Sequence, residues 1–171
     1  MKTLQVYVGT FLVLFTAVAC NDSNEEEVPF GMFVSESVNI AIQDQSGTDL
    51  LDPANPDALS RFKVYYLRDG EKQLYTDPLM DAPNGFVIEK FPLDEFYHLQ
   101  IFLNAPTSPD GNDSEWTTYL EFEDGHTDTI VAHYDIRPSY LAVDQASYNG
   151  IAVWDRSKNN GALQTYILVV P

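Results

Sequence analysis

The chain has 171 residues, and 26 acidic against 9 basic side chains give it a formal net charge of −17. Nucleic acids and anionic membranes are bound by positively charged surfaces, so this charge argues against both classes of partner. The single cysteine, Cys20, excludes an internal disulfide and a cysteine metal cluster. The length suffices for one domain whose core forms without such cross-links.

Residues 1–19 have the pattern of an export signal. Lys2 supplies the positive start, an apolar run follows over residues 6–19, and small residues precede Cys20. A membrane-spanning helix needs about 20 apolar residues, more than this run provides. Ala17-Val18-Ala19-Cys20 resembles the lipobox of bacterial lipoproteins, with Ala17 where the usual pattern has Leu. We therefore expect Cys20 to be lipidated; the alternative is an ordinary secretory signal that leaves a free thiol.

Residues 20–32 are predicted to form a solvated tether, because residues 21–27 are too acidic and too poor in apolar groups to fold. With two or three acyl chains on Cys20, burial at ~0.8 kcal/mol per CH₂ would make membrane attachment permanent. An acidic run directly after the lipidated cysteine also resembles the surface-export signal of Bacteroidetes lipoproteins. The expected location is the outer membrane, with the cell surface and the periplasmic face both left open.

Residues 33–171 predict a single all-β domain. Short runs of alternating apolar residues, beginning with 38–43, are separated by turn residues about every eight to twelve positions. Three dipeptides predict the turns of hairpins: Asp69-Gly70, Asp124-Gly125 and Asn149-Gly150. The last run, 163–170, is apolar on both faces towards its end and is predicted to be a central strand. The expected fold is an antiparallel two-sheet β-sandwich, immunoglobulin-like or related, with about nine strands.

Three landmarks stand in a recognisable order along the domain. They are residues 47–53 with Asn55-Pro56 after them, Asp128-Thr129-Ile130, and Tyr148-Asn149-Gly150 leading to Val153-Trp154. Together they resemble a group of uncharacterised Bacteroidetes lipoproteins of gut and oral species. The resemblance implies an exported, sandwich-like domain and brings no catalytic residues with it.

Several aromatic side chains are candidates for stacking on sugar rings, because aromatic rings offer flat apolar faces. The candidates are Trp116, Tyr119, Tyr148 and Trp154. Both tryptophans lie in alternating strands, where a core position is the favoured interpretation. Tyr119, between Thr117 and Glu121, is the best candidate for exposure.

An acidic loop at residues 110–115 is the candidate metal site, since Ca²⁺ takes six to eight oxygen ligands from such segments. Its candidate ligands are Asp110, Asn112, Asp113 and Glu115. Glu115 stands where an EF-hand needs glycine, and strand and loop replace the flanking helices, so the segment is not an EF-hand. The loop is either a Ca²⁺ site or an ordinary solvated loop, and no other cofactor is expected.

No set of catalytic residues stands out. His98, His126 and His133 are interpreted as solvent-facing strand residues, and no nucleophile-elbow motif marks a serine triad. So acidic a chain offers many chance pairs of carboxylates, which therefore do not predict a glycosidase.

The expected function is that of a non-catalytic, lipid-anchored binding or structural module at the outer membrane, accessory to glycan capture or adhesion. Its expected partners are the membrane, through the lipid, and a glycan or an envelope protein. Two alternatives stay open: a hydrolase of extracellular polymers that uses two carboxylates, and a structural module stabilised by Ca²⁺.

Overall fold

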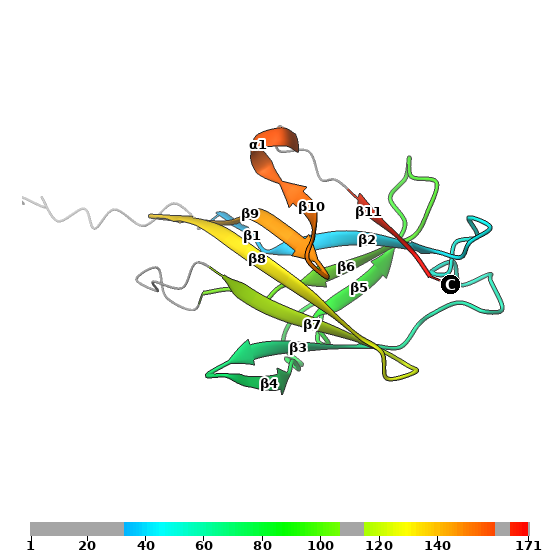
Figure 1. Ribbon diagram of the computed structural model, residues 1–171, viewed down its shortest axis with the longest axis horizontal. Helices are drawn as coiled ribbons and strands as arrows, with labels where there is room; N and C mark the ends of the chain where they lie inside the picture. Colours follow the sequence, from blue (N-terminus) through cyan, green and yellow to red (C-terminus); the bar gives the residue numbers. More distant parts are fainter. Residues whose placement is uncertain (1–32, 107–114, 160–164, 171) are drawn as a thin grey trace, which may run out of the picture. The chain divides into compact units, whose positions relative to one another are not determined.

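The computed structural model describes residues 33–106, 115–159 and 165–170 (Figure 1). The predicted leader, Cys20 and the predicted tether lie outside these residues, as do three of the candidate calcium ligands, Asp110, Asn112 and Asp113. The predictions made for them are therefore carried forward as predictions.

The described residues form two packed β-sheets, which confirms the predicted all-β sandwich. The larger sheet has the order β1-β9-β8-β7-β3-β4, and β10 pairs with β9 beside this path. Its strands are β1 (Phe33–Ser35), β3 (Phe62–Arg68), β4 (Glu71–Leu74), β7 (Trp116–Phe122), β8 (Thr127–Arg137), β9 (Tyr140–Tyr148) and β10 (Ile151–Asp155). The smaller sheet has the order β11-β2-β6-β5. Its strands are β2 (Ser37–Gln43), β5 (Phe86–Glu89), β6 (His98–Phe102) and β11 (Thr165–Val169).

The sheets hold eleven strands within the described residues, rather than about nine, and they are mixed rather than purely antiparallel. β1 pairs in parallel with β9, and β11 pairs in parallel with β2. Parallel neighbours cannot be joined by a tight turn, so no hairpin signal in the sequence indicates them.

β11 lies at the edge of its sheet, so the predicted central position of the last run is wrong. Tyr166 and Leu168 pack against the core, whereas Ile167 and Val169 are 49% and 58% exposed. An edge strand with apolar residues on its outer face has the same sequence pattern as a central strand, and periodicity alone cannot separate the two.

The three predicted hairpin turns are present. Asp69-Gly70 and Asn149-Gly150 both have two residues of positive φ, at 54° and 78° and at 48° and 80°, as a type I′ turn requires. At Asp124-Gly125 only the glycine has positive φ, 86°. There the amide of Phe122 donates to the carbonyl of His126, which closes a longer loop between β7 and β8.

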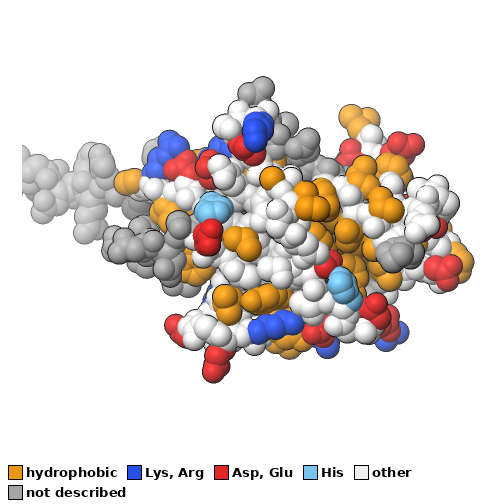
Figure 2. Space-filling view, in the orientation of Figure 1, with side chains coloured by type: hydrophobic (Ala, Val, Ile, Leu, Met, Phe, Trp, Pro, Cys, Tyr) orange, Lys and Arg blue, Asp and Glu red, His pale blue; other side chains and the backbone are white. Residues whose placement is uncertain are grey.

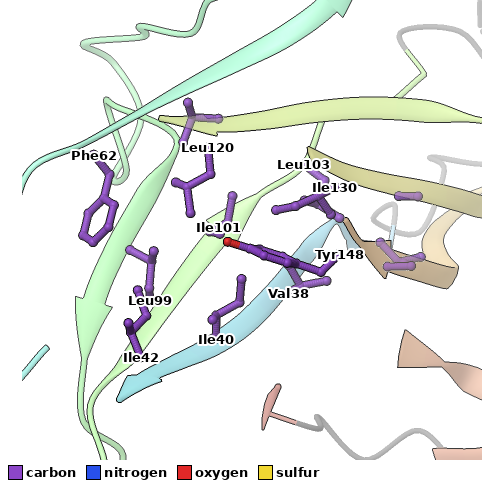
Figure 3. Packing of buried hydrophobic residues seen from close by; sticks show 14 of the residues in the cluster. Val38, Ile40, Ile42, Phe62, Leu99, Ile101, Leu103, Leu120, Ile130 and Tyr148 are labelled. Atoms are coloured by element: carbon purple, nitrogen blue, oxygen red, sulfur yellow. The ribbon is translucent and has the colours of Figure 1, made fainter. Parts of the chain in front are cut away.

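The core lies between the two sheets (Figure 3). Val38, Ile40 and Ile42 of β2 alternate towards it, as predicted, and are buried. Residues of the facing sheet complete it, among them Leu120 and Ile130, which are fully buried. Removing this apolar surface from water, at roughly 25 cal/mol per Å², is the main force that holds the sheets together.

A short helix, α1 (Arg156–Asn159), follows β10. In the part of the chain that the structure describes, no helix has the length and apolar character needed to cross a membrane.

The two ends of the sandwich differ in what they carry. β1 runs parallel to β9 and begins opposite Tyr140, so the chain enters the fold at the end where the β8–β9 turn lies. β9 finishes at Tyr148, and the Asp124-Gly125 and Asn149-Gly150 turns lie at the opposite end. That opposite end holds the larger pocket described below.

Candidate functional site

A pocket of about 720 Å³ opens between the β7–β8 turn, the β9–β10 turn and the end of β11. Its volume falls within the range of about 300–1,000 Å³ that is usual for ligand sites. Its apolar lining consists of Leu59, Phe122, Leu168, Val169 and Val170. Its polar lining consists of Glu123, Asp124, His126, Asp128 and Asn149. This mixture of an apolar lining with a few polar groups is typical of small-molecule sites.

Asp128 is the buried centre of the polar side, with only 3% of its surface exposed. It lies on the inner face of β8, because it pairs with Leu120 of β7 and is in phase with Ile130. Its Oδ2 accepts a hydrogen bond from the Tyr148 hydroxyl. Its Oδ1 accepts one from Asn149 Nδ2 at 2.7 Å and lies 2.7 Å from His126 Nε2. A buried carboxylate is costly unless donors surround it, and these three donors meet that need.

Asn149 connects the β9–β10 turn to β8. Its side-chain Oδ1 accepts a hydrogen bond from the backbone amide of Thr129 at 2.8 Å, and its backbone amide donates to the Thr129 carbonyl at 2.8 Å. The same residue therefore adopts the positive φ of the turn and donates to Asp128. These bonds fix the side-chain amide in the lining of the pocket.

His126 is an exposed member of the network, with 62% of its side chain accessible. Its backbone amide donates to Asp124 Oδ1 at 2.8 Å, and its ring lies 5.8 Å from the ring of Phe122. A carboxylate can only accept, so Nε2 carries the proton that it shares with Asp128. Nδ1 is then the ring nitrogen that is left for a ligand.

Tyr148 supplies the buried hydroxyl donor of the network. It is 1% exposed, and its ring lies 5.6 Å from that of Tyr166. Burial, followed by the hydrogen bond and the charge of Asp128, raises the pKa of the phenol far above its usual range. Tyr148 therefore remains a protonated donor to Asp128 under physiological conditions.

The burial of Tyr148 corrects its prediction as a sugar-stacking residue, because a ring inside the core has no free face. Trp116 and Trp154 are half-buried and lie in one cross-strand row, in the order Trp116, Ala132, Ala146, Trp154. Both alanines of this row are buried, so the row faces the interior. Trp154 also donates from Nε1 to the carbonyl of Val143 at 3.1 Å. These positions agree with the core interpretation of the two tryptophans.

Tyr119 lies on the outer face of the larger sheet, where it pairs with Tyr65 of β3. Lys72 Nζ lies 4.1 Å from the centre of the Tyr65 ring and 5.4 Å from that of Tyr119. Glu121 holds this lysine at 3.6 Å and Lys63 at 2.8 Å. In Figure 2, hydrophobic side chains adjoin a basic one over the lower strands of the sheet. Lys72 already lies near both rings, so the two tyrosines offer little free aromatic surface to a ligand. The pocket at Asp128 is therefore the better candidate site.

The three histidines differ in their surroundings. His98 is buried, at 4% exposure, with Nε2 2.8 Å from Asp94 Oδ2 and its ring 5.2 Å from that of Phe91, so its predicted exposure is wrong. The loop before β6 covers it, which strand alternation cannot indicate. His133 is half-exposed and lies 3.6 Å from Glu115, the one candidate calcium ligand within the described residues. Among those residues, no cluster of three or more His, Cys, Asp or Glu side chains is arranged to hold a metal ion.

Asp128, His126 and Asn149 lie in separate motifs of the sequence, so no local pattern indicates that they form one site. One signal was present, since Asp128 occupies an inward position in the same alternation as Ile130 and Ala132. An acidic residue in phase with core residues needs partners, and it therefore marks a buried polar network.

Comparison of the chain with protein-family models, curated proteins and solved structures finds no match. The chemistry of the pocket is therefore the basis for assigning a function.

Proposed function

We propose that this chain is a lipid-anchored, non-catalytic binding module of the bacterial outer membrane that captures glycans in the pocket at Asp128. The single observation that carries the proposal is the pairing of an apolar lining with fixed polar groups in one cavity of about 720 Å³. The lipobox-like segment before Cys20 and the resemblance to Bacteroidetes lipoproteins support the membrane location.

A sugar ring suits this pocket because it has apolar C–H faces and a rim of hydroxyl groups. Phe122 and Leu168 provide apolar surface for the ring. His126 Nδ1 can accept from a hydroxyl, while the carboxylate of Asp124 lies in the same lining. Asp128 is a positioning residue, since both of its oxygens are already used by Tyr148, Asn149 and His126. Asp128 therefore orients His126 and Asn149 rather than contacting the ligand itself.

The place of the pocket in the fold also supports capture at a surface. The chain enters the sandwich at one end, and the pocket opens at the other. Residues 20–32 span at most about 45 Å when fully extended, at ~3.5 Å per residue. With Cys20 in the membrane, a tether of this length would let the domain reach material outside the lipid.

The proposal is tested by glycan-array binding of the full chain in a polyoxyethylene detergent, which offers no sugar to the pocket. We expect selective binding of a glycan at micromolar affinity or tighter. His126→Ala should weaken this binding at least tenfold, whereas His133→Ala, a histidine on the outer face of β8, should leave it unchanged. Turnover of a polysaccharide or peptide would overturn the proposal, as would glycan binding that ignores His126.

A further inference from the structure

A second pocket, of about 260 Å³, lies apart from the first and has a different chemistry. It is bounded by Glu36 between β1 and β2, Tyr66 of β3, Tyr75 after β4, Met80 and Asp81 of the β4–β5 loop, and Phe102 of β6. Since liquid water occupies about 30 Å³ per molecule, the pocket has room for a small organic group.

Two tyrosine rings form a wedge in this pocket. The ring centres of Tyr66 and Tyr75 are 4.8 Å apart, and their planes are inclined at 41°. The face of an aromatic ring is electronegative and attracts cations. Arg68 already shows this attraction, because its guanidinium carbon lies 5.2 Å from the centre of the Tyr66 ring. Arg68 does not belong to the lining of the pocket, although its charge acts on Tyr75 as well as on Tyr66.

Glu36 brings a negative charge to the same pocket. Its side chain is half-buried and forms no hydrogen bond or ion pair with any residue that the structure describes. Withdrawal from water raises the pKa of this carboxyl above its ordinary value. Asp81 adds a second carboxylate to the lining, which includes no lysine or arginine. A carboxylate withdrawn from water without a partner is stabilised when a cation arrives.

We propose that this pocket binds an organic ammonium ion, with Glu36 as its counter-ion and Tyr66 and Tyr75 as its aromatic walls. Met80 and Phe102 contribute apolar surface, which favours an ammonium that carries alkyl groups over a hydrated metal ion. Such an ion occurs as a free amine or as the headgroup of a membrane lipid. The proposal is independent of glycan capture, because it concerns different residues.

The test is a calorimetric titration of the full chain, in the same uncharged detergent, with choline and with 3,3-dimethylbutanol. The two compounds have nearly the same shape, but only choline is charged. We expect choline to bind at least tenfold more tightly than the alcohol. Methylammonium is titrated separately as the probe of a primary amine. Equal binding of choline and the alcohol would overturn the proposal, as would the binding of neither choline nor methylammonium.

Three variants locate the binding. Glu36→Gln and Tyr75→Leu should each weaken ammonium binding at least fivefold. Glu71→Gln is the matched control, because it removes an exposed acid on β4 that is outside the pocket. Thermal melting confirms that each variant is folded. Unchanged affinity in a folded Glu36→Gln variant would place the cation elsewhere and refute the site.

Vesicles separate the two sources of the ammonium group. The unlipidated variant Cys20→Ser is mixed with phosphatidylcholine vesicles or with phosphatidylglycerol vesicles and then sedimented. Binding to phosphatidylcholine that free choline displaces assigns the pocket to a lipid headgroup. Binding of free choline without vesicle binding assigns it to a soluble amine, and both results support an ammonium site.

Discussion

Tyr148 and Asp128 are joined by a hydrogen bond inside the sandwich, in which the phenol donates to Oδ2 of the carboxylate. Tyr148 belongs to β9 and Asp128 to β8, so the bond crosses between neighbouring strands. It places a charged group at the boundary between the core and the larger pocket. The energetic consequence of this arrangement can be measured directly.

Tyr148→Phe should lower the free energy of unfolding by about 1–3 kcal/mol, because a buried carboxylate oxygen then loses its donor. Urea denaturation at neutral pH measures the change. Tyr166→Phe is the matched control, since Tyr166 packs against Tyr148 but makes no hydrogen bond to the described residues. Equal losses in the two variants would mean that the bond to Asp128 contributes nothing.

Asn149→Gly should also reduce stability, by about 1–2 kcal/mol. Glycine keeps the positive φ of the turn but removes the side-chain bonds to Asp128 and Thr129. The control is Asp69→Gly in the other type I′ turn, where φ is 54°, and its expected effect is below about 0.5 kcal/mol. If both variants lose the same stability, backbone conformation rather than the Asn149 side chain is responsible.

Glu36→Gln should make the protein more stable at neutral pH. The raised pKa of Glu36, caused by burial, means that the folded state disfavours the charged carboxylate. Acidification protonates Glu36 in both states, so the advantage of the variant should disappear as the pH falls through and below the raised pKa. Tyr66, Tyr75, Tyr134 and Asp81 are the other titratable groups near this site, and the tyrosines do not titrate in this range. Urea midpoints at pH 7 and pH 3.5 give the comparison, and a stability gain that persists at the lower pH would contradict this explanation.

Cys20→Ser should release the protein from the membrane fraction of its native host. Without the thiol there is no site for the diacylglycerol, and a tether as polar as residues 21–27 does not bind a membrane. Mass spectrometry of the native protein should find a lipidated Cys20 at the amino terminus. A free thiol or an uncleaved leader would refute the anchor.

Local chemistry made the hairpins predictable. Asp69-Gly70 and Asn149-Gly150 are dipeptides that tolerate positive φ, and the alternating runs beside them identify which residues face the core. The parallel pairs were not predictable in the same way, because β1 and β11 meet partners that are distant in the chain. The burial of His98 depends on Phe91 and Asp94 of the preceding loop, whose path strand periodicity does not specify.

The two pockets, like the strands, were only partly predictable from the sequence. Asp128 is in phase with core residues, which indicates a buried polar group, but the apolar lining of that pocket comes from β7, the end of β11 and the segment before β3. Glu36, Tyr66 and Asp81 come from three separate segments, and only the packing of the two sheets brings them together. Contacts of this kind depend on tertiary structure and leave no local pattern in the sequence.

The parallel pairing of β2 with β11 affects how the protein folds. Tyr166 pairs with Ile40, so the smaller sheet is complete only after β11, the last strand of the described chain, has paired with the early strand β2. Folding slows when native contacts join such distant residues. A newly made chain therefore remains longer without its complete smaller sheet than a chain joined by hairpins alone would.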